Sequence, residues 1–251
     1  MLHLRWLFFD LGNTIWKSST PESRSQSGLY ATVGQRILEW LRQRGHPLPS
    51  DGAVLAASIW EAVDASVDAA EKGAVAPDPG SIARQVLASR GIRVSAAEGR
   101  QLWRLGEATA PERGITLAPD ALPTLDTLSR RGIRLGVITN RMFGGAHTRR
   151  DLDALGVGHL FEHVIVSADV GYLKPHPRIF QAALDAARAR QEDCAMVGDN
   201  MRTDIQGAKD AGLYAIWKRS RLTACDRPVT PDLTVDVLAD LLEMVGSKTS
   251  A

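Results

Sequence analysis

An aspartate follows the first apolar run of this chain, where an open parallel sheet would place a reactive group. Residues 7–9 are apolar and precede Asp10, and Gly12 with Asn13 then has the composition of a turn. The carboxyl ends of parallel strands open into a crevice, so a carboxylate there can act as a nucleophile or bind a metal ion. An aspartate after a strand can also be an ordinary turn residue or helix cap. Other motifs in the sequence are needed to distinguish these roles.

Further polar side chains follow apolar segments or precede a helical segment later in the chain. They are Thr139, Asn140, Lys174 and Asp199, and Asp204 stands five residues beyond Asp199. Taken singly, each has a structural explanation as a helix cap, a solvated loop charge or a turn residue. Taken together, their order and their positions at strand ends indicate one shared site.

With these motifs in this order, the sequence resembles the haloacid dehalogenase superfamily of hydrolases, specifically its magnesium-dependent phosphatase branch. The resemblance covers nearly the whole chain and rests on the Asp-Leu-Gly-Asn-Thr segment at residues 10–14 and on the later motifs. It implies a hydrolase that removes phosphate from a small phosphorylated metabolite through an aspartyl-phosphate intermediate. Such an intermediate splits one difficult displacement into two easier ones.

The resemblance implies a catalytic role for Asp10, Thr139 and Lys174. Asp10 would be the nucleophile, and Lys174 would offset the negative charge around it. Thr139 and Asn140 would hydrogen-bond the phosphate oxygens, together with Lys174. These four residues are therefore the expected catalytic and phosphate-binding set.

The same resemblance implies a Mg²⁺ ion between the nucleophile and the phosphate, because two anionic groups repel each other. Mg²⁺ prefers carboxylate, carbonyl and water ligands. Asp10, Asp199 and the main-chain carbonyl of Gly12 are the expected ligands. Asp204 would complete the metal site by orienting Asp199 or a bound water.

Gly12 departs from the family pattern, in which a second aspartate protonates the leaving oxygen and then activates water. Glycine has no side chain and cannot transfer a proton, and a positioned acid or base is worth about 10²–10⁴-fold in rate. A replacement acid could be His176, His147, Asp64 or Asp68, and the sequence does not choose between them.

Two alternatives to a phosphatase remain open. One is a phosphate-ligand binding or regulatory protein that kept the site but lost turnover with its acid. The other is a haloacid dehalogenase, although that branch carries tyrosine at the position of Gly12 and usually lacks the acidic cluster around Asp199. Because displacement of halide from carbon needs no metal, Asp199 and Asp204 favour phosphate as the substrate group.

The pattern of apolar segments predicts an α/β fold with a Rossmann-like parallel sheet and helices on both faces. Strands are expected at residues 4–9, 133–139, 163–167, 195–198, 214–217 and 233–235. Helices are expected at residues 119–131, 148–155, 177–190, 201–211 and 237–245. Gly132, Gly156 and Gly212 stand where helix C-caps should lie.

Residues 16–113 have a helical pattern only, with segments expected at 28–44, 54–70, 82–89 and 96–108. An insertion of this length should form its own domain, and the resemblance implies a cap that closes over the catalytic aspartate. Residues 1–15 and 114–251 would then form the catalytic core. Three tryptophans are expected in the interior of the cap, namely Trp40, Trp60 and Trp103. Trp16 and Lys17 could be hinge residues or could face the substrate.

The composition is that of an ordinary enzyme with a sizeable core. The formal net charge of +1 gives no support for binding to nucleic acid or membranes, and 44% of the residues are hydrophobic. The two cysteines, Cys194 and Cys225, form no metal-binding or redox motif, so a reducing cytoplasm is expected. The sequence leaves the oligomeric state open between monomer and homodimer.

Overall fold

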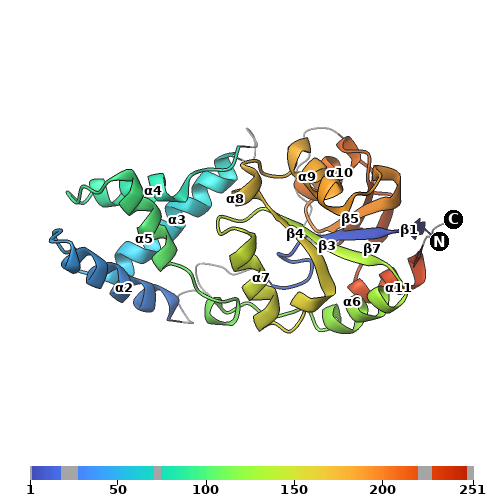
Figure 1. Cartoon of the computed structure of the whole chain (residues 1–251), viewed down its shortest axis with the longest axis horizontal. Helices are drawn as coiled ribbons and strands as arrows, with labels where there is room; N and C mark the ends of the chain where they lie inside the picture. Colours follow the sequence, from blue (N-terminus) through green and yellow to red (C-terminus); the bar gives the residue numbers. More distant parts are fainter. Residues whose placement is uncertain (1, 18–27, 71–74, 220–227, 248–251) are drawn as a thin grey trace. The chain divides into compact units, whose positions relative to one another are not determined.

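The computed structural model describes residues 2–17, 28–70, 75–219 and 228–247 (Figure 1). Cys225 lies outside these residues. The chain divides into two compact units, of which one joins Met1–Ser18 to Ile115–Ala251 and the other is Ser19–Gly114. In the described part of the chain, no helix is both long and apolar enough to cross a membrane.

The first unit is built on a six-stranded sheet in which all neighbouring strands are parallel. Across the sheet the strands are β4 (Phe161–Val166), β3 (Arg134–Thr139), β2 (Trp6–Phe9), β5 (Cys194–Gly198), β6 (Tyr214–Lys218) and β7 (Leu233–Val235). Every residue of β2 and of β5 is buried, as expected for strands covered on both faces. The predicted parallel α/β sheet is therefore confirmed.

Helices cover both faces of this sheet. In Figure 1, α9 (Pro177–Ala187) and α10 (Gly207–Asp210) lie on one side, and α6 (Ala121–Arg130) with α7 (Gly145–Ala154) lies on the other. Apolar side chains of α9 pack against those of β2 and β5, for example Phe180 in the cluster that contains Phe8 and Met196. This packing fixes the positions of β2 and β5 relative to α9.

The register of the central strands brings their ends together. Phe9, the last residue of β2, pairs with Val137 of β3 and with Val197 of β5. The residues that follow these three strands therefore emerge at the same edge of the sheet. The functional side chains predicted from the sequence lie at this edge.

Two ends of the chain differ from the expected pattern. The first expected strand is divided at Arg5 into β1 (Leu2–Leu4) and β2, and β1 pairs with β8 (Val245–Ser247). The expected helix at residues 237–245 is wrong, because it is replaced by a 3₁₀ turn, by α11 (Leu241–Met244) and by β8. Pairing with β1 gives residues 245–247 backbone partners that a local helical pattern cannot reveal.

Two other helices differ in form. The expected helix at residues 201–211 begins as a π-helix, Met201–Gln206, and continues as α10. Helix α7 begins at Gly145, three residues earlier than expected. The predicted helix C-caps are confirmed, because Gly132, Gly156 and Gly212 have φ values of 80°, 78° and 77°.

The described residues of the second unit form four α-helices and one 3₁₀ turn. The helices are α2 (Leu29–Gln43), α3 (Gly52–Ala70), α4 (Pro79–Ala88) and α5 (Ala96–Leu105). Ser95 and Glu98 form a capping box at the start of α5. The three expected interior tryptophans are buried, and the rings of Trp60 and Trp103 lie 5.2 Å apart.

Substitution of Gly136 should test how closely the central strands pack. A Cβ atom at this position would lie 2.7 Å from the ring of the buried Phe8. Gly136→Ala should lower the free energy of unfolding by about 1–3 kcal/mol through overpacking. Urea denaturation of Gly136→Ala, Phe8→Leu and the double variant measures the coupling. Additive effects of the two substitutions would contradict this explanation.

Candidate active site

The loop after β2 carries Asp10 at the sheet edge. Asp10 donates its main-chain N–H to the carbonyl of Val197 at 2.9 Å, which ties the loop to β5. The carbonyl of Leu11 then accepts main-chain hydrogen bonds from Ile15 and Trp16, each at 3.0 Å. The left-handed residue of this loop is Asn13, with a φ of 54°, and Gly12 is not among the glycines of positive φ.

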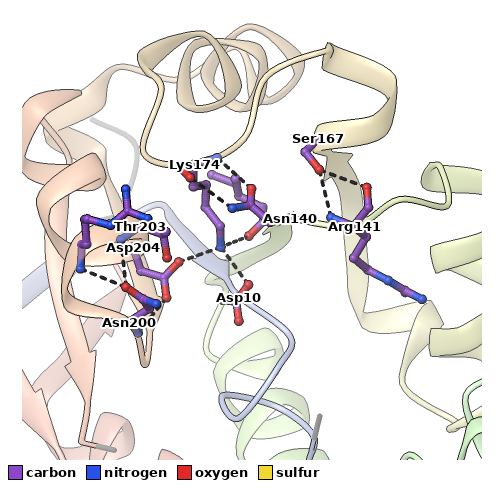
Figure 2. A network of polar contacts seen from close by, with 10 residues as sticks. Asp10, Asn140, Arg141, Ser167, Lys174, Asn200, Thr203 and Asp204 are labelled. Carbon is purple, nitrogen blue, oxygen red and sulfur yellow. Dashed lines mark hydrogen bonds and ion pairs between the residues drawn. The ribbon is translucent and has the colours of Figure 1, made fainter. Parts of the chain in front are cut away.

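Lys174 is the centre of the site, as Figure 2 shows. Its side chain is 2% exposed, and its Nζ atom lies 2.7 Å from Oδ1 of Asp10 and 2.7 Å from Oδ1 of Asp204. The same ammonium donates to the carbonyl of Ile138 at 2.8 Å. The contacts with Asp10 and Ile138 are hydrogen bonds, and the contact with Asp204 is an ion pair.

The charged groups of this cluster change the pKa values of Lys174 and Asp204. Burial by itself lowers the pKa of Lys174, but the carboxylates of Asp10 and Asp204 outweigh it and raise that pKa above its ordinary value. Burial raises the pKa of Asp204, and the charge of Asp10 adds to the increase, although Lys174 opposes it. Lys174 therefore stays protonated between its two partners.

Asp10, Asp199 and Asp204 could together hold a metal ion. Each offers one carboxylate oxygen, and these oxygens all lie within 4.8 Å of one another. Three carboxylates and one ammonium leave two negative charges in excess when all are ionised. An all-oxygen set of donors with excess negative charge fits a hard divalent cation such as Mg²⁺.

The loop after β5 is shaped to bring Asp204 close. Asp204 accepts the main-chain N–H of Asn200 through Oδ2 at 3.0 Å. The Asn200 side chain in turn accepts the N–H groups of Arg202 and Thr203, which caps the π-helix. A Cβ atom at position 198 would lie 2.3 Å from Oδ2 of Asp204, so this close approach requires Gly198.

The predicted phosphate-binding residues occupy the end of β3. Thr139 is the last residue of this strand and is buried. The side chain of Asn140 is engaged with the main chain of Lys174, because Oδ1 accepts its N–H at 2.7 Å and Nδ2 donates to its carbonyl at 3.1 Å. This amide holds the lysine loop in place, a function that the sequence did not indicate.

The sequence did not indicate that Arg141 and Ser167 would contact each other beside Asn140. The hydroxyl of Ser167 accepts the N–H of Arg141 at 2.9 Å and donates to its carbonyl at 3.0 Å (Figure 2). The guanidinium of Arg141 pairs with the buried Asp151 at 2.7 Å. Ser167 directly follows β4, so its position at the end of a strand was a signal of the same kind as that of Asp10, although only the first and last residues of β4 are buried.

The candidates for a replacement acid lie in different surroundings. His176 caps α9, where its Nδ1 accepts the N–H of Arg178 at 3.2 Å. His147 is buried on α7, and its Nε2 lies 3.6 Å from Oδ2 of Asp151. Asp64 and Asp68 belong to the second unit, on α3.

Trp16 and Lys17 continue the nucleophile loop. Trp16 is buried and forms isolated bridges with Gly12 and Leu117, and its ring lies 5.6 Å from the guanidinium carbon of Arg141. Lys17 donates its main-chain N–H to Thr116. Both residues are therefore tied to the segment through which the chain re-enters the first unit.

Three aspartates and a buried lysine gather at one edge of a parallel α/β sheet, and Lys174 comes from the segment between β4 and α9. Clustered titratable groups of this kind are typical of an enzyme's active site. The model of the haloacid dehalogenase-like hydrolases matches residues 4–212. This chain therefore belongs to the haloacid dehalogenase-like hydrolase family.

Named relatives of the chain include phosphatases and a dehalogenase. A phosphoserine phosphatase from Thermus thermophilus is 39% identical over 139 residues, which are 55% of each chain. A glyceraldehyde 3-phosphate phosphatase from Methanothermobacter thermautotrophicus is 37% identical over 128 residues, 50% of this chain and 56% of the relative. The chain thus spans about half the length of these curated relatives.

Among solved structures, a 2-haloacid dehalogenase from Pseudomonas syringae is similar over 96% of this chain and 97% of its own. The TM-score is 0.62 and the sequence identity is 26%. The fold is therefore shared by members of the family that differ in their named activity.

Asn140→Ala should loosen the lysine loop. It leaves the buried main-chain N–H of Lys174 without its acceptor, which costs about 1–3 kcal/mol of unfolding free energy. Hydrogen exchange at the Lys174 amide should accelerate in parallel. Gln181→Ala, which removes an exposed amide bonded to Asp185, is the matched control and should change stability by less than about 0.5 kcal/mol. Unchanged exchange at Lys174 would contradict the assigned role of Asn140.

Proposed function

We propose that this chain is a Mg²⁺-dependent phosphatase that acts on a small phosphorylated metabolite through an aspartyl-phosphate intermediate. The observation that carries the proposal is the cluster in which Lys174 bridges Asp10 and Asp204, with Asp199 completing the acidic set. Relatives named as phosphatases support the same conclusion.

Asp10 would attack the phosphorus with one carboxylate oxygen, and the ester oxygen would leave with the electron pair of the broken bond. Lys174 would hold the other carboxylate oxygen of Asp10 and limit the build-up of negative charge. Thr139 and the main chain of Asn140 would donate hydrogen bonds to the phosphoryl oxygens. Water would then hydrolyse the aspartyl-phosphate and release inorganic phosphate.

Asp10, Asp199 and the carbonyl of Gly12 would hold Mg²⁺, with Asp204 orienting this set. The bound ion would neutralise charge between nucleophile and phosphate. The fit rests on the three clustered carboxylate oxygens and on their excess of negative charge over the single ammonium of Lys174.

The helical insertion of residues 16–113 is proposed as the cap domain that selects the substrate and excludes water, as in other members of this family. Residues 1–15 and 114–251 are proposed as the catalytic core. A cytoplasmic location is proposed because neither cysteine belongs to a pairing motif.

A dehalogenase is the second candidate, since a solved dehalogenase shares the fold at 26% identity. Displacement of halide from carbon needs no metal, and an excess of carboxylates would then serve no purpose. The acidic cluster of Asp10, Asp199 and Asp204 therefore favours the phosphatase.

A substrate panel tests the proposed function directly. Release of phosphate from p-nitrophenyl phosphate, acetyl phosphate and a set of phosphorylated metabolites should require Mg²⁺ and should stop on addition of EDTA. Turnover of 2-chloropropionate in EDTA would instead identify a dehalogenase. Binding of Mg²⁺ without turnover of any ester would favour a phosphate-binding or regulatory protein.

Asp10→Asn should abolish turnover while the fold remains intact. The amide is nearly isosteric with the carboxylate, but it is a poor nucleophile and a weaker metal ligand. Phosphate release and thermal unfolding, measured on the same preparation, separate loss of chemistry from loss of fold. Activity close to that of the wild type would exclude an aspartyl-phosphate.

Gly12→Asp should restore the missing proton donor. The φ of Gly12 is not positive, so the backbone accepts a side chain there without left-handed strain. The rate on alkyl phosphates should rise by up to about 10²-fold, the lower end of the range for a positioned acid. The gain on p-nitrophenyl phosphate should be smaller, because nitrophenolate leaves without a proton.

Gly12→Asn is the matched control for this substitution, since it adds nearly the same atoms without an acid. It should show no gain that depends on the leaving group. If Gly12→Asp folds and binds Mg²⁺ but keeps the selectivity of the wild type, another residue already supplies the proton.

A further inference from the structure

The C-terminal end of β6 contacts two loops of the site through neighbouring residues. The indole Nε1 of Trp217 donates to the main-chain carbonyl of Asp199 at 3.0 Å. The ammonium of Lys218 donates to the main-chain carbonyl of Asn13 at 3.1 Å. The first contact lies in the loop after β5, and the second lies in the loop after β2.

These two contacts join the end of β6 to loops that follow two other strands of the sheet, β2 and β5. Strand β6 pairs with β5, where Trp217 lies opposite Gly198, and it does not pair with β2. The long side chain of Lys218 therefore crosses the width of β5 to reach the nucleophile loop. One dipeptide thus constrains both segments that carry the proposed metal ligands.

The carbonyl that Lys218 contacts belongs to the left-handed residue of the nucleophile loop. Asn13 has a φ of 54°, a left-handed conformation that asparagine adopts more readily than most residues with a side chain. The peptide unit before Asn13 contains the carbonyl of Gly12. A bond that fixes Asn13 therefore limits the directions in which the Gly12 carbonyl can point.

The indole of Trp217 is itself well fixed. Its side chain packs against the core cluster that includes Phe8, Phe180 and Met196. Its ring lies 6.0 Å from the guanidinium carbon of Arg219, which pairs with Asp236 at 3.0 Å. A donor held in this way can keep the main chain of Asp199 at one position.

We propose that Trp217 and Lys218 are positioning residues that set the affinity of the site for Mg²⁺ by fixing the loops of Asp199 and Gly12. The inference rests on the proposed function, because that function assigns the metal ligands. Groups that orient metal ligands without contacting the ion typically change metal affinity by about 10–100-fold.

The charge of Lys218 could affect the metal in the opposite direction. Among the described residues no carboxylate pairs with this ammonium, whereas Lys209 pairs with Asp232 and Lys174 pairs with Asp10. A half-exposed cation near the site repels Mg²⁺, and salt screens that repulsion. A positioning hydrogen bond is insensitive to salt, so ionic strength separates the two effects.

Trp217→Phe keeps a partly buried aromatic ring and removes the one N–H donor of the side chain. Isothermal titration calorimetry of the full chain should show Mg²⁺ affinity reduced by about tenfold, within the range for such groups. Lys218→Met should weaken binding to a similar extent at low and at high salt, and Lys218→Arg should retain most of the affinity. Thermal unfolding in EDTA reports the stability of the metal-free protein and should change little.

Lys209→Met is the matched control, since it removes the same charge from the same unit and should leave the Mg²⁺ affinity unchanged. If Trp217→Phe does not fold, the half-exposed Lys218 still provides the test. Mg²⁺ affinities within about twofold of the wild type, or tighter binding by Lys218→Met at low salt, would overturn the proposal.

The same measurements distinguish this inference from the proposed function. Wild-type protein that binds Mg²⁺ but hydrolyses no phosphate ester would defeat the phosphatase, while the calorimetry would still decide the role of Trp217 and Lys218. Wild-type turnover that requires Mg²⁺, with unchanged affinity in both variants, would overturn this inference alone.

Discussion

The burial of one charged lysine is the constraint on which the site depends. Moving an ammonium out of water costs several kcal/mol even after relaxation, so Lys174 must find compensating partners. It has two carboxylates and one carbonyl, and these come from the ends of β2 and β3 and from the helix after β5. Removal of either carboxylate would leave a buried charge without full compensation, which costs about 3–5 kcal/mol in comparable pairs. The lysine therefore joins three segments that are far apart in the sequence.

The remainder of the site keeps this cluster at its place on the sheet edge. Because β2, β3 and β5 share one register, the loops that follow them leave the sheet side by side at the same edge. Asn140 then holds the main chain of Lys174, and Ser167 holds that of Arg141. These side-chain bonds to backbone groups fix loops that would otherwise be the least ordered part of the fold.

The same cluster has more negative than positive charge, and the proposed function depends on this imbalance. A structural ion pair would balance its charges, but here Asp10, Asp199 and Asp204 face a single ammonium. Divalent cations relieve such an excess, and phosphate esters are the substrates for which a cation beside a carboxylate nucleophile is useful. In the proposed phosphatase, Lys174 would therefore both stabilise this cluster and offset the negative charge around Asp10.

The sequence by itself determined the parallel sheet, most of its strands and the residues gathered at its edge. Buried parallel strands are continuous apolar runs, which are a local signal in the sequence. Asp10 and Asp199 directly follow such runs, Lys174 precedes α9, and Asp204 lies five residues beyond Asp199 within the π-helix. Only the tertiary structure decided the partners of β1 and β8, the bond between Asn140 and the Lys174 loop, and the contacts of Trp217 and Lys218 with the site. Each of these joins residues far apart in the chain, and such pairs form because crossover connections and packing bring them together. A local pattern carries no information about that choice, since the same residue types would serve equally well with other partners.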